Sequence, residues 1–151
     1  MTLPLPAATA RKKPANPRHR ARQFVLQGLY QSLVGGQDQA SILAQAKDVA
    51  GFDKIDRDLY EKLLQQILGD TGGLQEALTP YLDRAWNEIS PIEQGILLIG
   101  ACELKHFPEI PYRVVLNEAI ELARSYGGTD GHKFVNGILD KLATQLRSEE
   151  T

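Results

Sequence analysis

Two helical patterns joined by a glycine-rich turn, within residues 111–146, constrain the fold of this chain more than any other feature. Before the turn, apolar side chains recur at intervals of four, three and four residues, which places them on one face of a helix. A similar spacing returns after the turn. The apolar positions are Val115, Ala119, Leu122 and Tyr126 in the first segment, and Val135, Ile138, Leu142 and Leu146 in the second. The sequence therefore predicts a helical hairpin.

The turn of this hairpin, residues 127–131, reads Gly-Gly-Thr-Asp-Gly. One of its first two glycines suits the positive φ that ends many helices, and Thr129 or Asp130 suits the cap of the next helix. A glycine-rich loop before a helix can also bind phosphate, although Asp130 would repel that anion. His132 and Lys133 follow in the first turn of the second helix. They could contact RNA or simply be solvated, and the residues alone leave both interpretations open.

Helical spacing of apolar residues also covers most of the chain before the hairpin. A first helix is expected from Arg18 to a Gly-Gly stop, and a second over residues 37–50. A third follows with Asp53 or Asp56 as its cap, and Thr71 then caps a short fourth helix. No segment shows the period-2 alternation of a half-buried strand. The sequence therefore predicts an all-α fold.

The clearest local motif is Ser90-Pro91-Ile92-Glu93. Ser90 suits the N-cap, Pro91 suits the first helical position, and Glu93 completes a capping box. The helix that follows is apolar nearly all round, and Pro108 ends it. Such a helix is expected to be the buried centre of the fold.

The length and composition suit one cytoplasmic domain. A chain of 151 residues can bury a real core, and a single Cys102 excludes an internal disulfide. No apolar run reaches the roughly 18 residues of a membrane span, and the N-terminus lacks the charge order of a secretory signal. Residues 1–17 are rich in proline and alanine, so we expect a disordered basic extension before a domain over residues 18–148.

Catalytic motifs are absent from the sequence. It has no nucleophile elbow, no P-loop and no dinucleotide fingerprint. Cys102 lies in the most apolar helix, where a protonated structural thiol is expected. His19, His106 and His132 lack the spacing of zinc ligands. The sequence therefore predicts a protein that is not an enzyme and has no metal or cofactor.

Positive charge is concentrated near the N-terminus. Residues 1–37 contain six Lys or Arg and no acidic residue, whereas the remainder has 11 basic and 19 acidic residues. Arg18, Arg20 and Arg22, with His19, begin the first helix, where cations oppose the macrodipole at a cost of roughly a few tenths of a kcal/mol each. This arrangement favours a bound anion such as nucleic acid. A solvated, disordered tail is the alternative, and composition alone does not decide between them.

Four segments match, in order, the motifs of a known family. Residues 18–31 read R-H-R-A-R-Q-F-V-L-Q-G-L-Y-Q, and residues 90–94 read S-P-I-E-Q. Residues 111–123 read P-Y-R-V-V-L-N-E-A-I-E-L-A, and residues 127–141 read G-G-T-D-G-H-K-F-V-N-G-I-L-D-K. Through these segments the chain resembles the NusB family of bacterial transcription antitermination factors. The last two are highly specific, and the resemblance covers about residues 18–147.

The resemblance implies a fold of about seven helices in two packed sub-bundles and a function as an RNA-binding adaptor. Members of this family bind the boxA element of nascent RNA, chiefly in ribosomal RNA operons, together with NusE, a small-subunit ribosomal protein. The complex joins NusA, NusG and RNA polymerase and suppresses termination. Some members also form homodimers.

The resemblance further implies roles for single residues. The expected RNA-binding residues are Arg18, His19, Arg20, Arg22, Tyr30, Asp130 and Lys133, and Glu93 is expected to bind the partner protein. His19 stands where the family often has arginine, so one cationic contact becomes pH-dependent or absent. Tyr30 could stack on an unpaired base, although the residues alone favour a partly buried core position. Asp130 is expected to restrain RNA affinity by repelling phosphate. Together these residues predict one RNA surface, from the start of the first helix to the hairpin turn.

Two other functions are considered. NusB-like domains occur fused to ribosomal RNA methyltransferases, but this chain has no room for a methyltransferase domain. A helical homodimerisation or protein–protein adaptor module, without specific RNA binding, is the main alternative. The affinity for boxA RNA discriminates between this module and an antitermination factor.

Overall fold

The computed structural model describes residues 16–150, which contain helices and no strands. The prediction of an all-α fold is therefore confirmed. The seven α-helices of this part of the chain are α1 (Pro17–Gly35), α2 (Gln39–Lys47), α3 (Arg57–Gly69), α4 (Thr71–Leu78), α5 (Pro91–His106), α6 (Tyr112–Tyr126) and α7 (Gly131–Leu146). Three short 3₁₀ segments connect them: η1 (Phe52–Lys54), η2 (Thr79–Tyr81) and η3 (Trp86–Glu88).

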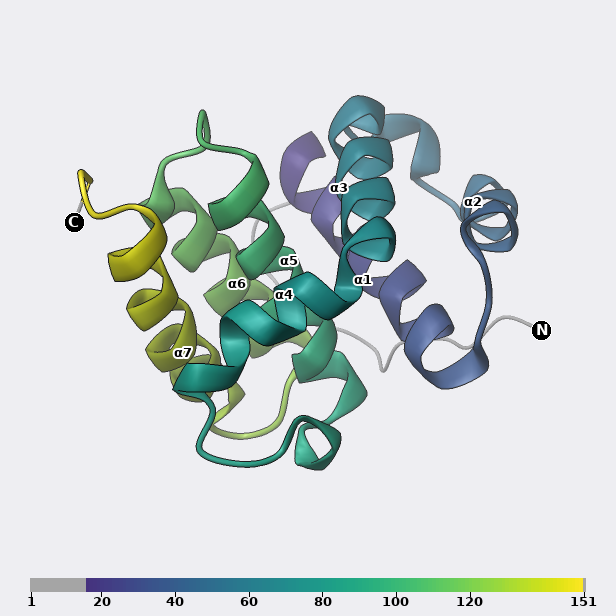
Figure 1. Ribbon diagram of the computed structural model, residues 1–151. Helices are drawn as coiled ribbons and strands as arrows, with labels where there is room; N and C mark the ends of the chain where they lie inside the picture. The colour runs from purple at the N-terminus through teal and green to yellow at the C-terminus, as the bar shows by residue number, and fades with distance from the viewer. Residues whose placement is uncertain (1–15, 151) are drawn as a thin grey trace.

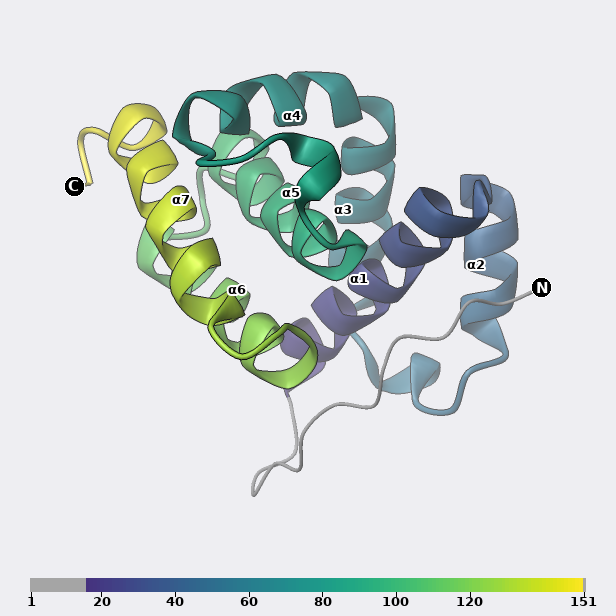
Figure 2. The same ribbon diagram turned by 90° about the horizontal axis from the view of Figure 1, so that it is seen from below.

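The helices form two sub-bundles, as predicted (Figure 1). One contains α1, α2 and α3, and the other contains α5, α6 and α7, with α4 leading from the first to the second. Helix α5 is central, since it packs against α1, α3, α4, α6 and α7. Seen from below, α5 lies between α1 and α7 (Figure 2). None of the helices described is long and apolar enough to cross a membrane.

Helix α1 begins one residue earlier than its basic cluster indicates. Asn16 is the N-cap, and its side chain accepts a hydrogen bond of 2.7 Å from the backbone N–H of His19. Pro17 takes the first helical position, where its missing N–H has no cost. The expectation that Pro17 belongs to the extension is thus wrong, and residues 1–15 lie outside the described part of the chain. Gly36, with φ +67°, ends the helix as predicted.

Two caps between α1 and α5 differ from the sequence expectations. Of the two candidates for the α3 cap, Asp56 takes the role, because its Oδ1 accepts from the Leu59 N–H at 3.0 Å. Thr71 does not cap α4. It lies inside that helix and donates its hydroxyl to the carbonyl of Ile67 at 2.8 Å. The α3–α4 junction is therefore a bend in which Asp70 holds the cap position.

Helix α5 is buried along nearly its whole length, as its sequence predicts. Ser90 Oγ accepts a hydrogen bond of 3.3 Å from the Glu93 N–H, and Pro91 is at the first position. Two glycines allow close packing. A Cβ at Gly95 would lie 2.8 Å from Leu26 Cδ1 on α1, and one at Gly100 would lie 2.5 Å from Leu139 Cδ1 on α7.

The predicted hairpin is formed by α6 and α7, but its turn differs in detail. Neither Gly127 nor Gly128 has a positive φ. Gly127 is extended (φ −83°, ψ 177°), and a Cβ there would lie 2.7 Å from the Ala123 carbonyl oxygen, so the turn needs glycine for space. Asp130 occupies the N-cap position of α7 without a capping bond from its side chain. Its backbone carbonyl accepts from the N–H groups of Lys133 and Phe134 instead.

Candidate nucleic-acid interface

The predicted site residues fall into two groups at opposite ends of α5. We call the first group, Arg18, His19, Arg20 and Arg22, the arm end, because these residues begin α1 and lie near the last turns of α5. The second group, Glu93, Asp130 and Lys133, is the turn end, because it surrounds the α6–α7 turn beside the first turn of α5. In Figure 1 the start of α1 and the α6–α7 turn lie at opposite ends of the molecule. The prediction of one continuous surface starting at Arg18–Arg22 is corrected accordingly.

The separation of the two groups follows from helix geometry. Arg22 contacts Glu103, whereas the turn end surrounds Glu93 on the same helix. A rise of about 1.5 Å per residue puts these two positions about 15 Å apart along α5. A single RNA strand could reach both ends, but they are separate patches of the protein.

Arg22 is not placed to contact RNA. Its side chain is 2% exposed and lies against Glu103, which is 1% exposed. Nε and Nη2 donate to the two carboxylate oxygens of Glu103, each at 2.8 Å. Burial alone would lower the pKa of Arg22, yet the bonds to Glu103 and the surrounding carboxylates raise it overall. The expected RNA contact is therefore corrected: this guanidinium is a buried partner of α5.

His19 is also turned inward. Its imidazole is buried, and Nδ1 contacts Glu118 Oε2 on α6. Glu118 reaches Arg22 as well, with 3.6 Å between Glu118 Oε1 and Arg22 Nη1. His19 and Arg22 thus attach the first turns of α1 to α5 and α6, and neither presents its charged group to solvent.

Arg18 and Arg20 remain the cations of the arm end that could meet a phosphate. Arg18 is exposed, and Arg20 is half-buried. The Arg20 guanidinium extends toward the loop before η1, since its Nη1 lies 3.8 Å from the position of a Cβ on Gly51. The inward and outward cations of this cluster are indistinguishable by residue type, so the sequence could not separate them.

Glu103 also connects the arm end to the end of the chain. Its backbone carbonyl accepts a hydrogen bond of 3.1 Å from Arg147 Nη2, while its carboxylate binds Arg22. Arg147 is buried and donates to three further carbonyls, those of Leu104, Phe107 and Ile110. It therefore binds carbonyls of the last turn of α5 and of the α5–α6 connection, two of which, those of Glu103 and Phe107, also accept backbone N–H groups. Sequence reasoning missed Arg147, because one arginine after a helix has no distinctive spacing.

At the turn end, Glu93 lies against the start of α7. A Cβ on Gly131 would lie 2.5 Å from Glu93 Oε2, and one on Gly128 would lie 4.0 Å from it. An acidic group at a helix N-terminus interacts favourably with the helix dipole. The Glu93 side chain, which the sequence predicted to complete a capping box with Ser90, is thus directed to the start of α7. The structure brings Glu93 and the turn together.

Asp130 and Lys133 form the exposed rim of the turn end. Their side chains are 74% and 73% exposed, and 3.6 Å separates Asp130 Oδ1 from Lys133 Nζ. A pair this exposed contributes little to stability. His132, which lies between them in sequence in the first turn of α7, is half-buried. Both members of the pair are therefore accessible to an incoming strand.

An aromatic ring with a stacked cation adjoins this rim and was missed from the sequence. The Arg84 guanidinium carbon lies 4.4 Å from the ring centre of Phe134, in the first turn of α7. Asp83, and more weakly Glu93 and Glu88, raise the pKa of Arg84. Phe134 is only partly buried. Its apolar type indicated a core position, and Arg84 is fifty residues away in sequence, so only the fold could pair them.

Tyr30 lies on the half of α1 nearer to the turn end. Its neighbour Leu29 packs toward the start of α5, with Leu29 Cβ 3.7 Å from the position of a Cβ on Gly95. Tyr30 itself is half-buried. It therefore belongs with the turn end rather than with the arginines that precede it on the same helix.

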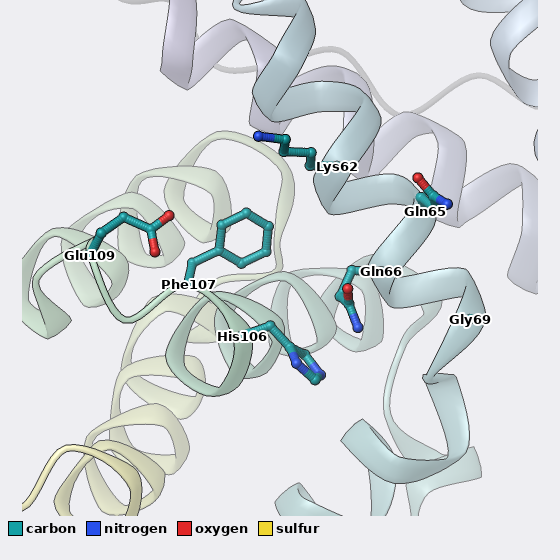
Figure 3. A pocket seen from close by; sticks show the side chains of 7 residues that line it. All are labelled: Lys62, Gln65, Gln66, Gly69, His106, Phe107 and Glu109. Carbon is teal, nitrogen blue, oxygen red and sulfur yellow. The ribbon is translucent and has the colours of Figure 1, made fainter.

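A hollow of 580 Å³ lies elsewhere, at the seam between α3 and the end of α5 (Figure 3). Its lining is polar and mixed in charge, with Lys62, Gln65 and Gln66 from α3, and His106, Phe107 and Glu109 opposite. His106 is bound to Asp70, with 3.0 Å between Nε2 and Oδ2. Hydrogen bonds from His106 and Lys105 lower the pKa of Asp70. None of the predicted site residues lines this hollow.

The groups that could carry chemistry fit structural roles. Cys102 is buried, and burial together with the charges of Glu103 and Asp70 raises the pKa of its thiol to about 12. Such a thiol is protonated and unreactive at neutral pH, as predicted. Within residues 16–150, no cluster of three or more His, Cys, Asp or Glu is placed to hold a metal ion.

Known proteins resemble this chain in sequence and structure. The model of the NusB family matches residues 19–144. The transcription antitermination protein NusB of Aromatoleum aromaticum is 54% identical over 133 residues, covering 88% of this chain and 92% of that protein. NusB of Ralstonia pickettii is 47% identical over 150 residues, covering 99% and 97%.

Two solved structures share the fold. The structure of T. maritima NusB is 29% identical, with a TM-score of 0.76, and covers 87% of this chain and 94% of that one. A structure of the antitermination factors NusB and NusE in complex with dsRNA is 20% identical, with a TM-score of 0.71, and covers 84% and 96%.

Proposed function

The chain belongs to the NusB family of transcription antitermination proteins, and we propose that it acts by binding boxA RNA of nascent ribosomal RNA transcripts together with NusE. The proposal draws on the names of its relatives and on the complex of NusB and NusE with dsRNA described above. This function needs no catalytic group. The buried Cys102 and His19 fit structural roles, in agreement with it.

One observation carries the proposal: the turn end combines a half-buried aromatic ring, a guanidinium stacked on it and a charged rim. Phe134 and Arg84 provide the ring and the cation, and Asp130 and Lys133 provide the rim. Unpaired RNA bases bind aromatic faces and guanidinium planes by stacking, while cations meet phosphates. This combination suits single-stranded RNA better than a purely apolar protein surface does.

We assign the remaining residues to supporting roles. Arg18 and Arg20, at the arm end, supply phosphate contacts for the part of the RNA that extends beyond the turn end. Tyr30 lies toward the turn end and is proposed as a stacking or edge contact. Asp130 restrains the affinity by repelling phosphate, whereas Lys133 raises it. Glu93 is proposed to bind NusE or to position the turn for it.

The wider assembly follows from the same proposal. The RNA and NusE complex is expected to join NusA, NusG and RNA polymerase, so that transcription continues through terminators. We propose that only the free protein forms homodimers, and that RNA binding competes with dimer formation. The basic residues 1–15 lie outside the described structure, and we propose that their Arg and Lys side chains add phosphate contacts.

The proposal is tested by RNA binding with and without NusE. Gel shifts with a boxA oligonucleotide should show higher affinity when NusE is present, and a scrambled oligonucleotide should bind more weakly. Equal affinity for the two oligonucleotides would reject specific recognition. Sedimentation of the free protein, with and without RNA, then shows whether RNA reduces self-association.

A matched pair of variants tests the site itself. Arg84→Gln removes the cation over Phe134, whereas Arg57→Gln removes a cation that lies over the Phe52 ring at 5.0 Å in the other sub-bundle. We expect Arg84→Gln to weaken boxA binding about fivefold or more, because stacking is worth about 1–3 kcal/mol per base. Arg57→Gln should bind as the unchanged protein does. Equal effects of the two variants would place the RNA elsewhere.

A further inference from the structure

The segment that carries Arg84 comprises residues 82–89, which we call the connector. It leads from η2 at the end of α4, beside α7, to the first turn of α5 (Figure 2). Residues 83 and 84 of the connector make no backbone–backbone hydrogen bond within the described part of the chain. The position of the Arg84 guanidinium over Phe134 therefore depends on how the ends of the connector are held.

One hydrogen bond joins the second half of the connector to the central helix. Gln94 Nε2 on α5 donates to the backbone carbonyl of Trp86 at 2.8 Å, and Gln94 is 8% exposed. The other hydrogen bonds that residues 85–89 make with described residues stay inside that segment. Gln94 is therefore the polar link between this part of the connector and α5.

Apolar burial also holds the connector on the body of the protein. Ile89 is 3% exposed, and the half-buried Trp86 packs against the core. Apolar contact is non-directional, whereas a hydrogen bond has a narrow range of distance and angle. Burial thus keeps the connector in place, and the bond from Gln94 adds the restraint on its orientation.

The ion pair of Arg84 orients its guanidinium but does not anchor the connector. Arg84 Nε donates to Asp83 Oδ1 at 2.9 Å, and Nη2 donates to Oδ2 at 3.4 Å. These bonds fix the plane of the guanidinium relative to Asp83. Asp83 belongs to the same connector, however, and moves with it. Lys141 on α7 adds a longer-range attraction to Asp83.

We propose that Gln94 is a positioning residue of the RNA site, because its bond to Trp86 fixes the connector with the Arg84 guanidinium over Phe134. The inference rests on the proposed function, in which a base stacks on this pair. A side chain that is already ordered loses less freedom when RNA binds, so the bond raises the affinity for RNA. Gln94 acts through Arg84, since its own side chain is buried against the connector.

NMR of the full chain tests the position of Arg84 directly. An aromatic ring shifts the resonances of protons stacked on it, and the guanidinium carbon of Arg84 lies 4.4 Å from the ring centre of Phe134. Gln94→Met removes the donor and keeps the length of the side chain. We expect the shift of the Arg84 Nε–H to move toward the value in Phe134→Leu, which lacks the ring. Arg57, stacked on Phe52 in the other sub-bundle, should keep its shift.

The variants at Gln94 are expected to fold. In Gln94→Met the Trp86 carbonyl keeps the backbone N–H of Ile89 at 3.1 Å. Gln94→Asn, whose amide is one methylene too short to reach this carbonyl, is a second variant with the same expected result. Circular dichroism checks the fold of both. Trp86 is the one tryptophan of the chain, so its quenching by acrylamide should increase in both variants.

Fluorescence anisotropy with a boxA oligonucleotide measures the effect on RNA binding. We expect Gln94→Met to weaken binding about threefold, the effect of leaving one flexible side chain to be ordered by the RNA. Gln65→Met, at an exposed glutamine of α3, is the matched control and should bind as the unchanged protein does. In an Arg84→Gln background, Gln94→Met should have no further effect, because the residue that it positions is absent.

Three results overturn the inference. The first is an Arg84 shift that is unchanged in Gln94→Met, and the second is an unchanged affinity of that variant for boxA RNA. The third is an equal loss of affinity from Gln94→Met with and without Arg84. If no form of the protein binds boxA RNA, the proposed function fails, and the shift of Arg84 still decides whether Gln94 positions it.

Discussion

At one end of α5, Glu103 lies buried beneath Arg22, whereas at the other end Glu93 lies against the exposed turn between α6 and α7. Both ends contain arginine or lysine close to a carboxylate. At the arm end the charges are paired in the interior and attach α1 to the central helix. At the turn end the pair of Asp130 and Lys133 is largely exposed to solvent.

This difference shows that residue type does not decide the role of a charge. A buried guanidinium on a buried carboxylate fixes the geometry of the fold, and losing one partner leaves the other without compensation. An exposed pair of the same types has little effect on stability and remains free to exchange its partner for RNA. The arm end should therefore respond to mutation mainly in stability, and the turn end mainly in RNA affinity.

The largest effect is expected from Arg22→Ala. Removing the guanidinium leaves Glu103 buried without its cation, so we expect a loss of about 3–5 kcal/mol in the free energy of unfolding. Urea denaturation followed by circular dichroism measures it. Lys62→Ala is the control, because Lys62 pairs with Asp58 at 3.1 Å on the surface, and it should cost about 0.5 kcal/mol or less.

A double variant, Arg22→Met with Glu103→Met, sharpens this prediction. It removes both charges and keeps apolar volume, so it should recover most of the stability lost in Arg22→Ala. A cost below about 1 kcal/mol for Arg22→Ala would show that Glu103 is hydrated, and the contrast between the two ends would then disappear.

The second effect concerns the dependence of the arm end on the C-terminal residues. Arg147→Met removes the donors of four backbone carbonyls at the end of α5 and in the α5–α6 connection. We expect a loss of about 2–3 kcal/mol, because the carbonyls of Leu104 and Ile110 lose their guanidinium donor, whereas those of Glu103 and Phe107 keep a backbone N–H. Thermal denaturation measures this loss. Lys141→Met is the control, because Lys141 is an exposed residue of α7. Equal stability of the two variants would mean that water replaces the guanidinium without cost.

The third effect is the salt dependence of RNA binding. Since Arg22 is buried, at most five of the six basic residues in positions 1–37 can meet phosphate, which limits their share of the slope of log K against log salt to about 3.5. Deleting residues 1–13 should lower the slope by about 2, because three cations are lost. Anisotropy titrations at several salt concentrations measure both slopes. An unchanged slope would show that these residues do not contact RNA.

The smallest effect is expected from Asp130→Asn at the turn end. Its side chain makes no capping bond, so stability should change by less than about 0.5 kcal/mol. Removing the negative charge should strengthen boxA binding about twofold to fivefold, because phosphate repulsion is weak at an exposed site. Anisotropy with boxA RNA tests this expectation. Weaker binding by Asp130→Asn would show that the carboxylate stabilises the turn more than it repels RNA.

Most of the fold could be predicted from local patterns. Helix spacing identified α1, α3, α5 and the α6–α7 hairpin, because each buries one face whose period is visible over several turns. The Ser90 cap and the Gly36 stop were also correct, since both depend on neighbouring residues alone. The errors lie at junctions. Thr71 and Asp130 are good capping residues by type, but Thr71 lies inside α4, and Asp130 takes the N-cap position of α7 without a capping bond from its side chain.

The candidate site was predicted less completely. The contact of Glu93 with the turn and the cation over Phe134 were both invisible in the sequence, because Glu93 and Arg84 are distant in sequence from α7. The basic cluster of α1 was located correctly, but all four of its residues were predicted to contact RNA, whereas two of them are buried. A helix turns about 100° per residue, so neighbouring cations on α1 point to different sides, and only the packing of α5 and α6 decides which of them is buried.

The sequence by itself determined the all-α class, the central position of α5, the hairpin and the membership of a family, because these depend on periodicity and on contiguous motifs. Only the tertiary structure decided that His19 and Arg22 face inward, that Arg147 closes the end of α5, and that the turn end lies about 15 Å along α5 from the arm end. The physical reason is that the role of a charged side chain depends on whether the surrounding helices bury and pair it or leave it in solvent. Glu103 and Glu118 come from helices more than eighty residues after the cations they bind.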